Sequence, residues 1–88
     1  MKKFNKVVFI CTGNTCRSPM AEGLLKHFAL DKNLEVSSRG LMVFGETPAN
    51  DSAVYVMKEQ GIDIARHVSK PLDKAELGEH TLVLTMAH

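Results

Sequence analysis

The sequence of 88 residues has no long apolar run, little net charge and only two cysteines. Its longest apolar stretch near the N-terminus covers residues 7–11. A transmembrane helix needs about 20 such residues, and the stretch is also too short for the hydrophobic region of a signal peptide. The formal net charge of +1 removes the bulk positive field on which nonspecific nucleic-acid binding depends. We therefore predict a protein that binds neither nucleic acid nor membrane.

The two cysteines and the short chain narrow the class of protein further. Cys11 and Cys16 are too close in the sequence to join distant segments, which favours a reducing compartment and predicts a cytoplasmic location. A chain of this length buries only about 60–70% of the surface that its unfolded form exposes. No internal repeat, low-complexity tract or linker divides it. We predict one small domain over residues 1–88.

Three short segments rich in β-branched and aromatic residues predict strands. Residues 6–10 form an apolar run without polar alternation, which is typical of a strand buried on both faces of a parallel sheet. Residues 34–38 and 81–86 are the second and third candidates, and a short capped turn is predicted over 73–76. Strands that alternate with helices predict an α/β fold, in which ligands bind beyond the carboxyl ends of the strands.

Two segments carry helical spacing. Ser18 is predicted to cap the first helix and Pro19 to occupy its first position, and residues 31–33 are predicted to close it. An apolar stripe that faces the sheet is predicted on this helix at Ala21, Leu24, Leu25 and Phe28. The second helix is predicted to follow a cap and proline at 47–48, and Gly61 is placed to end it in the left-handed conformation.

The segment between the first strand and the first helix has the composition of an anion-binding loop. Successive backbone N–H groups can curl into a nest here, with Gly13 available for unusual dihedral angles. The positive end of the following helix adds to the attraction for a tetrahedral oxyanion. The predicted phosphate-binding residues are Thr12, Gly13, Asn14, Thr15, Cys16, Arg17 and Ser18.

Cys11 and Arg17 are the predicted catalytic residues of this loop. Cys11 ends the strand inside the positive field of the helix and the guanidinium, which lowers the pKa of a thiol and supplies a thiolate nucleophile at neutral pH. The planar guanidinium of Arg17 can hold two phosphate oxygens at once. The Ser18 hydroxyl is a donor for the sulfur or for the leaving oxygen. A buried structural thiol and a solvated arginine are the alternatives, and the loop context argues against both.

The segment CTGNTCRSPMAE, residues 11–22, resembles the phosphate loop of low-molecular-weight protein tyrosine phosphatases, including their bacterial protein-arginine phosphatase branch. The resemblance continues through residues 36–40, 61–63, 66–68 and 82–86. It implies a three-layer α/β fold with flanking helices and a parallel sheet of three strands in the order 2-1-3. It also implies a two-step hydrolysis in which Cys11 attacks phosphorus to give a phosphocysteine, while Arg17 and the loop N–H groups stabilise the transition state.

The resemblance assigns further roles to individual residues. The family's loop-supporting network maps onto Asn14, Ser18, Ser38 and His67. Cys16 is implied to capture an oxidised Cys11 in a reversible disulfide, with a merely structural thiol as the alternative. Two cysteines with a distant histidine make no recognised zinc ligand set, and no metal or other cofactor is implied.

Thr15 occupies the position that sorts substrates within the family. A threonine there resembles the arginine-phosphatase version, whereas tyrosine-directed members usually carry a bulkier apolar residue. A small side chain with a hydroxyl can admit a planar phosphoguanidinium and hydrogen-bond its nitrogens. The resemblance therefore favours protein phosphoarginine over phosphotyrosine. The predicted partners are a phosphorylated protein substrate and a phosphate ion held in the loop.

The sequence departs from the family in its general acid. The family uses an Asp-Pro pair after the third strand, and no Asp-Pro occurs here. The fourth strand and the C-terminal helix of a complete domain are also missing, which indicates a chain truncated at its C-terminus. Loss of a general acid costs about 10²–10⁴-fold in rate, so we expect impaired hydrolysis. The third strand would then be an exposed apolar edge, through which a homodimer is predicted to form.

Two other functions stay open. An arsenate reductase has a similar loop but relays oxidation through two further cysteines, and Met86 stands where one of them is expected. A non-catalytic oxyanion-binding module is consistent with the missing acid.

Overall fold

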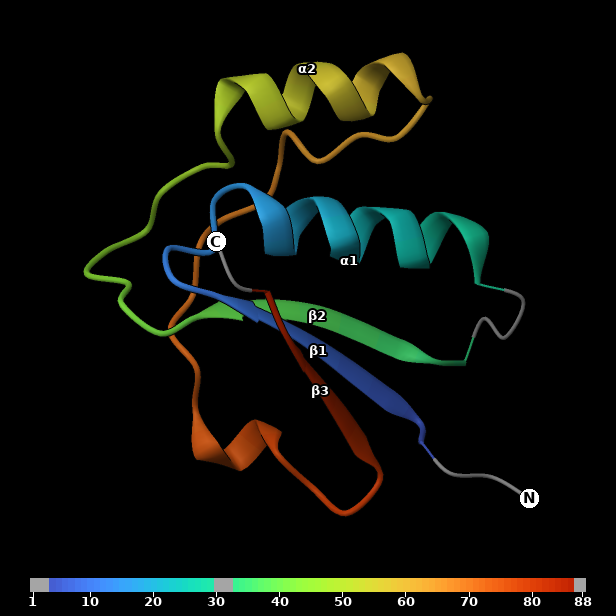
Figure 1. Ribbon diagram of the computed structural model, residues 1–88, viewed down its shortest axis with the longest axis vertical. Helices are drawn as coiled ribbons and strands as arrows, with labels where there is room; N and C mark the ends of the chain where they lie inside the picture. Colours follow the sequence, from blue (N-terminus) through green and yellow to red (C-terminus); the bar gives the residue numbers. More distant parts are fainter. Residues whose placement is uncertain (1–3, 30–32, 87–88) are drawn as a thin grey trace.

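Strands and helices alternate along the chain in the computed structural model, which describes residues 4–29 and 33–86 (Figure 1). The elements in chain order are β1 (Lys6–Cys11), α1 (Arg17–Phe28), β2 (Glu35–Gly40), α2 (Asp51–Glu59), the short 3₁₀ helix η1 (Lys74–Glu76) and β3 (Thr81–Thr85). The strands are parallel and lie in the order β2-β1-β3. The predicted α/β fold with its strand order 2-1-3 is thereby confirmed.

The register of the sheet brings the carboxyl ends of all strands to one edge. Cys11 at the end of β1 lies beside Gly40 at the end of β2, and Ile10 lies beside Thr85 at the end of β3. Because β1 is central, it is buried along residues 7–10, as its apolar run predicts. The polar loop after Cys11 therefore begins where a parallel sheet opens its ligand-binding edge.

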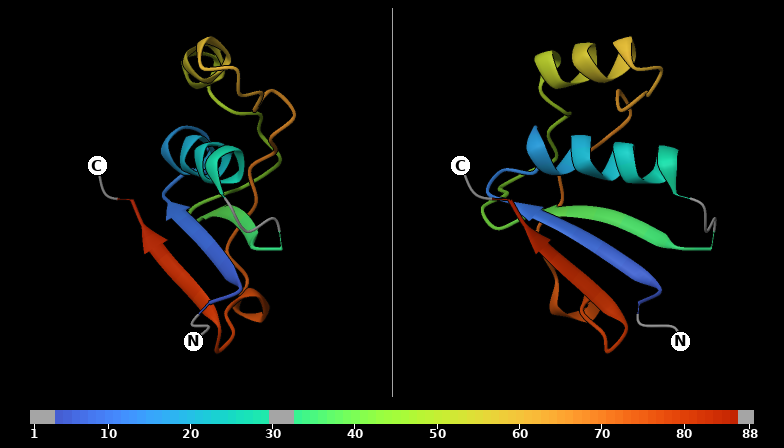
Figure 2. Two further views of the ribbon diagram at one scale, coloured as in Figure 1. Left: turned by 90° about the vertical axis from the view of Figure 1, so that its right-hand side faces the viewer. Right: turned by 45° about the vertical axis from the view of Figure 1, so that its right-hand side comes forward.

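Both α-helices lie on the same side of the sheet, with α1 between the sheet and α2 (Figures 1 and 2). One core cluster joins α1 to the sheet and consists of Val7, Phe9 and Val36 with Ala21 and Leu25 packed against them. A second cluster joins α2 and the segment after it to α1 and consists of Ala49, Ala53, Met57, Ile62 and Ile64 with Met20 and Val54. The three layers are therefore sheet, α1 and α2, and η1 lies on the opposite side of the sheet in Figure 2.

The position of α1 between two layers changes which of its residues are buried. Of the predicted apolar stripe, Ala21 and Leu25 pack towards the sheet, but Leu24 is 40% exposed and Phe28 is 68% exposed. The prediction was wrong for these two residues. α1 also buries a second face, around Met20, against the cluster that α2 contributes to, and the predicted stripe does not include this face. The helices of the described residues are all too short and too polar to cross a membrane.

The start of each helix differs from its prediction. α1 begins at Arg17, with Cys16 in the capping position and no side-chain cap, so the predicted cap at Ser18 was wrong. Pro19 still falls in the first turn, where a backbone N–H has no helical partner to lose. α2 begins at Asp51 and is capped by Asn50, whose side chain accepts from the Ser52 N–H. The predicted cap at 47–48 was therefore also wrong.

The other predicted boundaries are mostly confirmed. Gly61 has a φ of 77° directly after α2, as expected for a left-handed helix end. Asp73 caps η1 by accepting from the Ala75 N–H. α1 ends at Phe28, ahead of the predicted 31–33, and residues 31 and 32 lie outside the described residues.

Candidate active site

The loop between β1 and α1 curls around the sulfur of Cys11. The backbone N–H of Asn14 donates to Cys11 Sγ at 3.1 Å. Asn14 has a φ of 57°, the left-handed value that lets consecutive N–H groups converge, whereas Gly13 has no positive φ. The prediction that Gly13 supplies the unusual dihedral was therefore wrong. Asparagine tolerates the left-handed region better than most residues, and here its side chain is held from three directions.

Asn14 is fully buried, and each polar group of its side chain has a partner. Its Nδ2 donates to Ser18 Oγ at 2.8 Å and to Ser38 Oγ at 2.9 Å. Its Oδ1 accepts from the Lys70 N–H at 2.9 Å. The asparagine thus ties the loop to α1, to β2 and to the segment after α2.

His67 completes this network from the segment after α2. Its Nε2 lies 2.7 Å from the backbone oxygen of Asn14. Because a carbonyl oxygen only accepts, this contact places the proton on Nε2. The structure therefore brings together all four predicted loop-supporting residues, Asn14, Ser18, Ser38 and His67.

Cys11 is half-buried at the end of β1, and its surroundings favour the thiolate. Burial raises the pKa of the thiol, but hydrogen bonds to the sulfur outweigh it and lower the pKa below its ordinary value. The strongest is the contact with the Ser18 hydroxyl at 2.8 Å, and backbone groups of Ser18, Asn14 and Thr15 add to it. The predicted direction is confirmed, and hydrogen bonds account for it.

A small cavity of about 190 Å³ opens over the sulfur. Its lining residues are Cys11, Thr12, Gly13, Thr15, Cys16, Arg17 and Met86. Cys16 and Arg17 are exposed at this cavity, and both cysteines are free thiols. Five of the seven predicted phosphate-binding residues thus line one cavity together with Cys11, while the other two, Asn14 and Ser18, are buried.

Met86 also lines this cavity, at the position where the resemblance to arsenate reductases places a redox cysteine. It directly follows β3 and packs against the core cluster that contains Phe9. Its N–H donates to Ile10 O at 2.7 Å. This hydrogen bond holds Met86 beside the end of β1, next to Cys11. Sequence separation hid this contact, since only the register between β1 and β3 places the two residues together.

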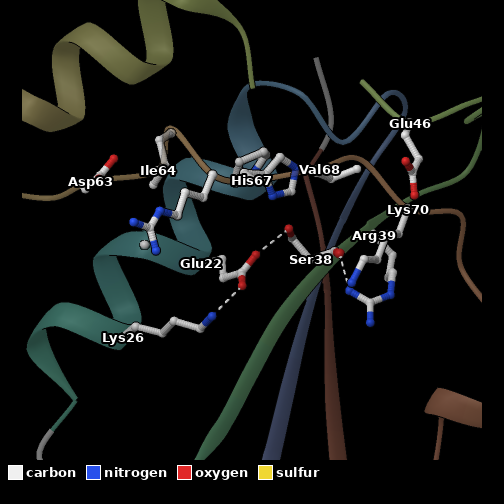
Figure 3. Close-up of a pocket in the computed structure, with 13 residues that line it drawn as sticks. Glu22, Lys26, Ser38, Arg39, Glu46, Asp63, Ile64, His67, Val68 and Lys70 are labelled. Atoms are coloured by element: carbon white, nitrogen blue, oxygen red, sulfur yellow. Dashed lines mark hydrogen bonds and ion pairs between the residues drawn. The ribbon is translucent and has the colours of Figure 1, made fainter. Parts of the chain in front are cut away.

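A larger groove of about 460 Å³ lies beside the loop-supporting network (Figure 3). Its lining residues include Glu22, Lys26, Ser38, Arg39, His67 and Lys70. Glu22 points from α1 towards Ser38, whose hydroxyl donates to Glu22 Oε1 at 2.6 Å (Figure 3). Sequence reasoning missed Glu22, although its position four residues after Ser18 places both on one face of α1.

The part of the chain that the structure describes contains no group of three His, Cys, Asp or Glu side chains that could hold a metal ion.

Comparison with known proteins identifies relatives of this site and fold. A family model described as low molecular weight phosphotyrosine protein phosphatase matches residues 6–88. An arsenate reductase 2 from Staphylococcus haemolyticus is 45% identical over 80 residues, covering 91% of this chain and 58% of its own. A protein-arginine-phosphatase from Bacillus subtilis is 43% identical over 84 residues, covering 93% and 55% respectively.

A solved structure is similar over the same region. The low molecular weight protein tyrosine phosphatase from T. tengcongensis has a TM-score of 0.82 and 48% sequence identity, with 92% of this chain and 57% of that chain covered. The present chain thus spans little more than half the length of the relatives it matches.

Proposed function

Because the chain belongs to the low molecular weight phosphotyrosine protein phosphatase family, we propose that it acts on phosphorylated protein side chains through a phosphocysteine on Cys11. The observation that carries this proposal is the thiol itself. It lies under a cavity lined by the loop and Arg17, and hydrogen bonds lower its pKa. A thiolate in that position is a nucleophile that can attack an oxyanion bound by the loop.

The proposed reaction has two steps. The Cys11 thiolate attacks phosphorus, an S–P bond forms, and the bond from phosphorus to the leaving nitrogen or oxygen breaks as the leaving group takes up a proton. Water then attacks the phosphocysteine, the S–P bond breaks, and inorganic phosphate leaves with the thiolate restored. Arg17 and the loop N–H groups stabilise the oxygens that gain charge in both transition states.

Thr15 supports phosphoarginine as the preferred substrate. It lines the cavity over Cys11 and is half-buried. Two protein-arginine-phosphatases are among the similar proteins, at 43% and 41% identity. We propose that the hydroxyl hydrogen-bonds the guanidinium nitrogens, which a phenyl ring does not offer.

The missing Asp-Pro general acid is expected to limit the rate of hydrolysis by these 88 residues. The sequence contains no Asp-Pro pair. Without an acid, the leaving group must depart with little help, which costs about 10²–10⁴-fold. We therefore propose that these 88 residues turn over aryl phosphates with good leaving groups faster than phosphoarginine.

Cys16 is proposed as the redox partner of Cys11, since both free thiols line the same cavity. Peroxide would oxidise the Cys11 thiolate to a sulfenic acid, and the Cys16 thiol would displace water to form the disulfide. A thiol reductant would restore both residues. Peptide mapping after peroxide treatment tests this step, and a stable sulfinic acid on Cys11 would contradict it.

Arsenate reduction is the second candidate, because the S. haemolyticus relative carries that name. The family reaction needs further cysteines after the loop cysteine, and Met86 lines the cavity where one is expected. A thioether cannot form a disulfide, so the arrangement favours hydrolysis over reduction. A third possibility is a module that binds an oxyanion without turnover.

One experiment separates the three functions. Phosphate release is measured from phosphoarginine and from aryl phosphates, arsenate reduction is measured with a thiol reductant, and phosphate binding is measured by calorimetry. We expect the parent chain to release phosphate. Cys11→Ser should abolish this release and still bind phosphate. Arsenate turnover without phosphate release would favour the reductase, and binding without any turnover would favour the module.

A further inference from the structure

A line of hydrogen bonds runs from the groove of Figure 3 through the protein to the sulfur of Cys11. Its members in order are Glu22, Ser38, Asn14, Ser18 and Cys11, joined at 2.6, 2.9, 2.8 and 2.8 Å. The three central residues are almost completely buried. Buried chains of this kind strengthen each bond by polarising the next. The carboxylate of Glu22 ends the line on the groove side, where Lys26 pairs with it.

The donor and acceptor roles along this line follow from its two ends. A carboxylate only accepts, so the single proton of Ser38 points to Glu22. Ser38 Oγ then receives one proton of Asn14 Nδ2, and Ser18 Oγ receives the other. The proton of Ser18 is left for Cys11 Sγ, which makes it a donor to the thiolate.

We propose that Glu22 is a positioning residue for the reaction of Cys11, because it holds and polarises Ser38 as the acceptor that anchors Asn14 and, through Asn14, keeps the Ser18 hydroxyl aimed at the sulfur. Lys26 holds the carboxylate from the groove side at 2.7 Å. The Lys70 N–H fixes the other end of the Asn14 amide. Glu22 itself touches neither the sulfur nor the loop. The inference rests on the proposed function only in taking Cys11 as the nucleophile.

Two variants with the same charge change isolate the hydrogen bond from the charge. Glu22→Gln removes the negative charge but keeps an oxygen that accepts from Ser38, whereas Glu22→Leu removes both. Loss of a nearby negative charge alone lowers the pKa of a thiol in either variant. The pKa of Cys11 is read from the pH dependence of its alkylation by iodoacetamide, with the modified residue located by mass spectrometry.

We expect the Cys11 pKa in Glu22→Leu to exceed that in Glu22→Gln by about half a pH unit. A shift of this size corresponds to weakening, without breaking, the hydrogen bond from Ser18 to the sulfur. The same pair is then compared in a Ser38→Ala background, which cuts the line. There the two variants should have equal pKa values, because a coupled pair loses its difference once the partner is removed.

Equal pKa values for Glu22→Leu and Glu22→Gln in the otherwise unchanged chain would overturn the proposal. A difference that persists with Ser38→Ala would overturn it as well, since the effect would then bypass Ser38. Should Glu22→Leu fail to fold by circular dichroism, Glu22→Ala replaces it in the same comparison. The readout needs no turnover, so failure of the proposed phosphatase activity is distinguishable from failure of this role.

Discussion

At the scale of single residues, Asn14 combines two requirements that are rarely met by one side chain. Its backbone takes the left-handed conformation that turns an N–H towards Cys11, and its buried amide binds Ser18, Ser38 and Lys70. A glycine would meet the first requirement and an alanine neither. The residue therefore links the shape of the loop to the rigidity of the layer beneath it.

Replacing Asn14 by alanine is expected to lower the free energy of unfolding by about 3 kcal/mol or more. It removes three hydrogen bonds of a buried side chain, and alanine lacks the polar group that helps asparagine to hold the left-handed conformation. Gly13→Ala is the matched control one residue earlier. Its new Cβ would meet no atom closer than Thr15 Oγ1 at 3.7 Å, so we expect a stability close to that of the parent chain. Urea unfolding measures both. A large loss for Gly13→Ala with little for Asn14→Ala would contradict this account.

Ser18→Ala is expected to raise the pKa of Cys11 by about one pH unit. Hydrogen bonds to charged groups contribute about 1.5–3 kcal/mol, and we take the lower end because the sulfur is partly exposed to solvent. The alkylation rate as a function of pH measures the shift. Ser52→Ala removes the hydroxyl of an exposed serine on α2, provides the control and should leave the pKa of Cys11 unchanged.

The same lowered pKa has a consequence for stability. A thiol whose pKa is lower in the folded than in the unfolded protein stabilises the fold above the unfolded pKa, and this contribution is lost as the pH falls through the folded pKa. Stability should therefore rise with pH between the two values, and Cys11→Ser should abolish that rise.

The loop residues are predictable from the sequence because strand end, glycine, arginine and helix start lie together in it. The choice between Gly13 and Asn14 for the left-handed position is not, because both residue types tolerate it. Asn14 takes this position because its side chain binds Ser38 and Lys70, which lie 24 and 56 residues away in the sequence. Glu22 was not predicted for the same reason, since its proposed role depends on Ser38, which lies on β2 and is 16 residues away in the sequence.

At the scale of elements, the end of β2 must approach the loop closely, and Gly40 makes that possible. A Cβ at Gly40 would lie 3.0 Å from Asn14 Cβ and 3.0 Å from the backbone oxygen of Thr12. Gly40 also donates to Lys70 O and accepts from the Leu72 N–H. The strand end is thus fixed between the loop and the segment after α2, with no room for a side chain.

Gly40→Ala is expected to destabilise the protein by about 1–3 kcal/mol and to weaken phosphate binding, because backbone and a buried side chain must shift to admit the methyl group. Gly45→Ala provides the control, since a Cβ there would meet no atom within 4 Å. Thermal unfolding and phosphate titration measure the two effects. Equal behaviour of the two variants would show that the contact at Gly40 relaxes at no cost.

Strands were more predictable than helix starts in this chain. A buried strand needs only a run of apolar residues, and β1 has one. The helix starts were harder to predict, because a capping residue can bind other groups instead of the backbone N–H groups of its helix. Ser18 instead binds Cys11 and Asn14, and Pro48 forms a bridge with Val68, so neither residue caps a helix.

At the scale of the whole molecule, β3 forms one edge of the sheet, paired with β1 on one side only among the described residues. Val83 is 38% exposed and Leu84 is 40% exposed. Exposed apolar side chains on an edge strand with free backbone groups favour pairing with a further strand. The relatives of known structure are longer than this chain, which covers 57% of the T. tengcongensis protein.

A homodimer paired through β3 remains our prediction for the 88-residue chain, and light scattering at micromolar concentration should give twice the monomer mass. Leu84→Lys should restore the monomer, because a charged lysine on an edge strand opposes strand addition. Val56→Lys is the control, since Val56 is 47% exposed and lies on α2, away from the sheet edge (Figure 1). A monomer at all concentrations would contradict the pairing, and a dimer that Leu84→Lys leaves intact would place the contact elsewhere. Because Met86 follows β3 and lines the cavity over Cys11, the dimer and its Leu84→Lys monomer should also differ in the alkylation rate of that thiol.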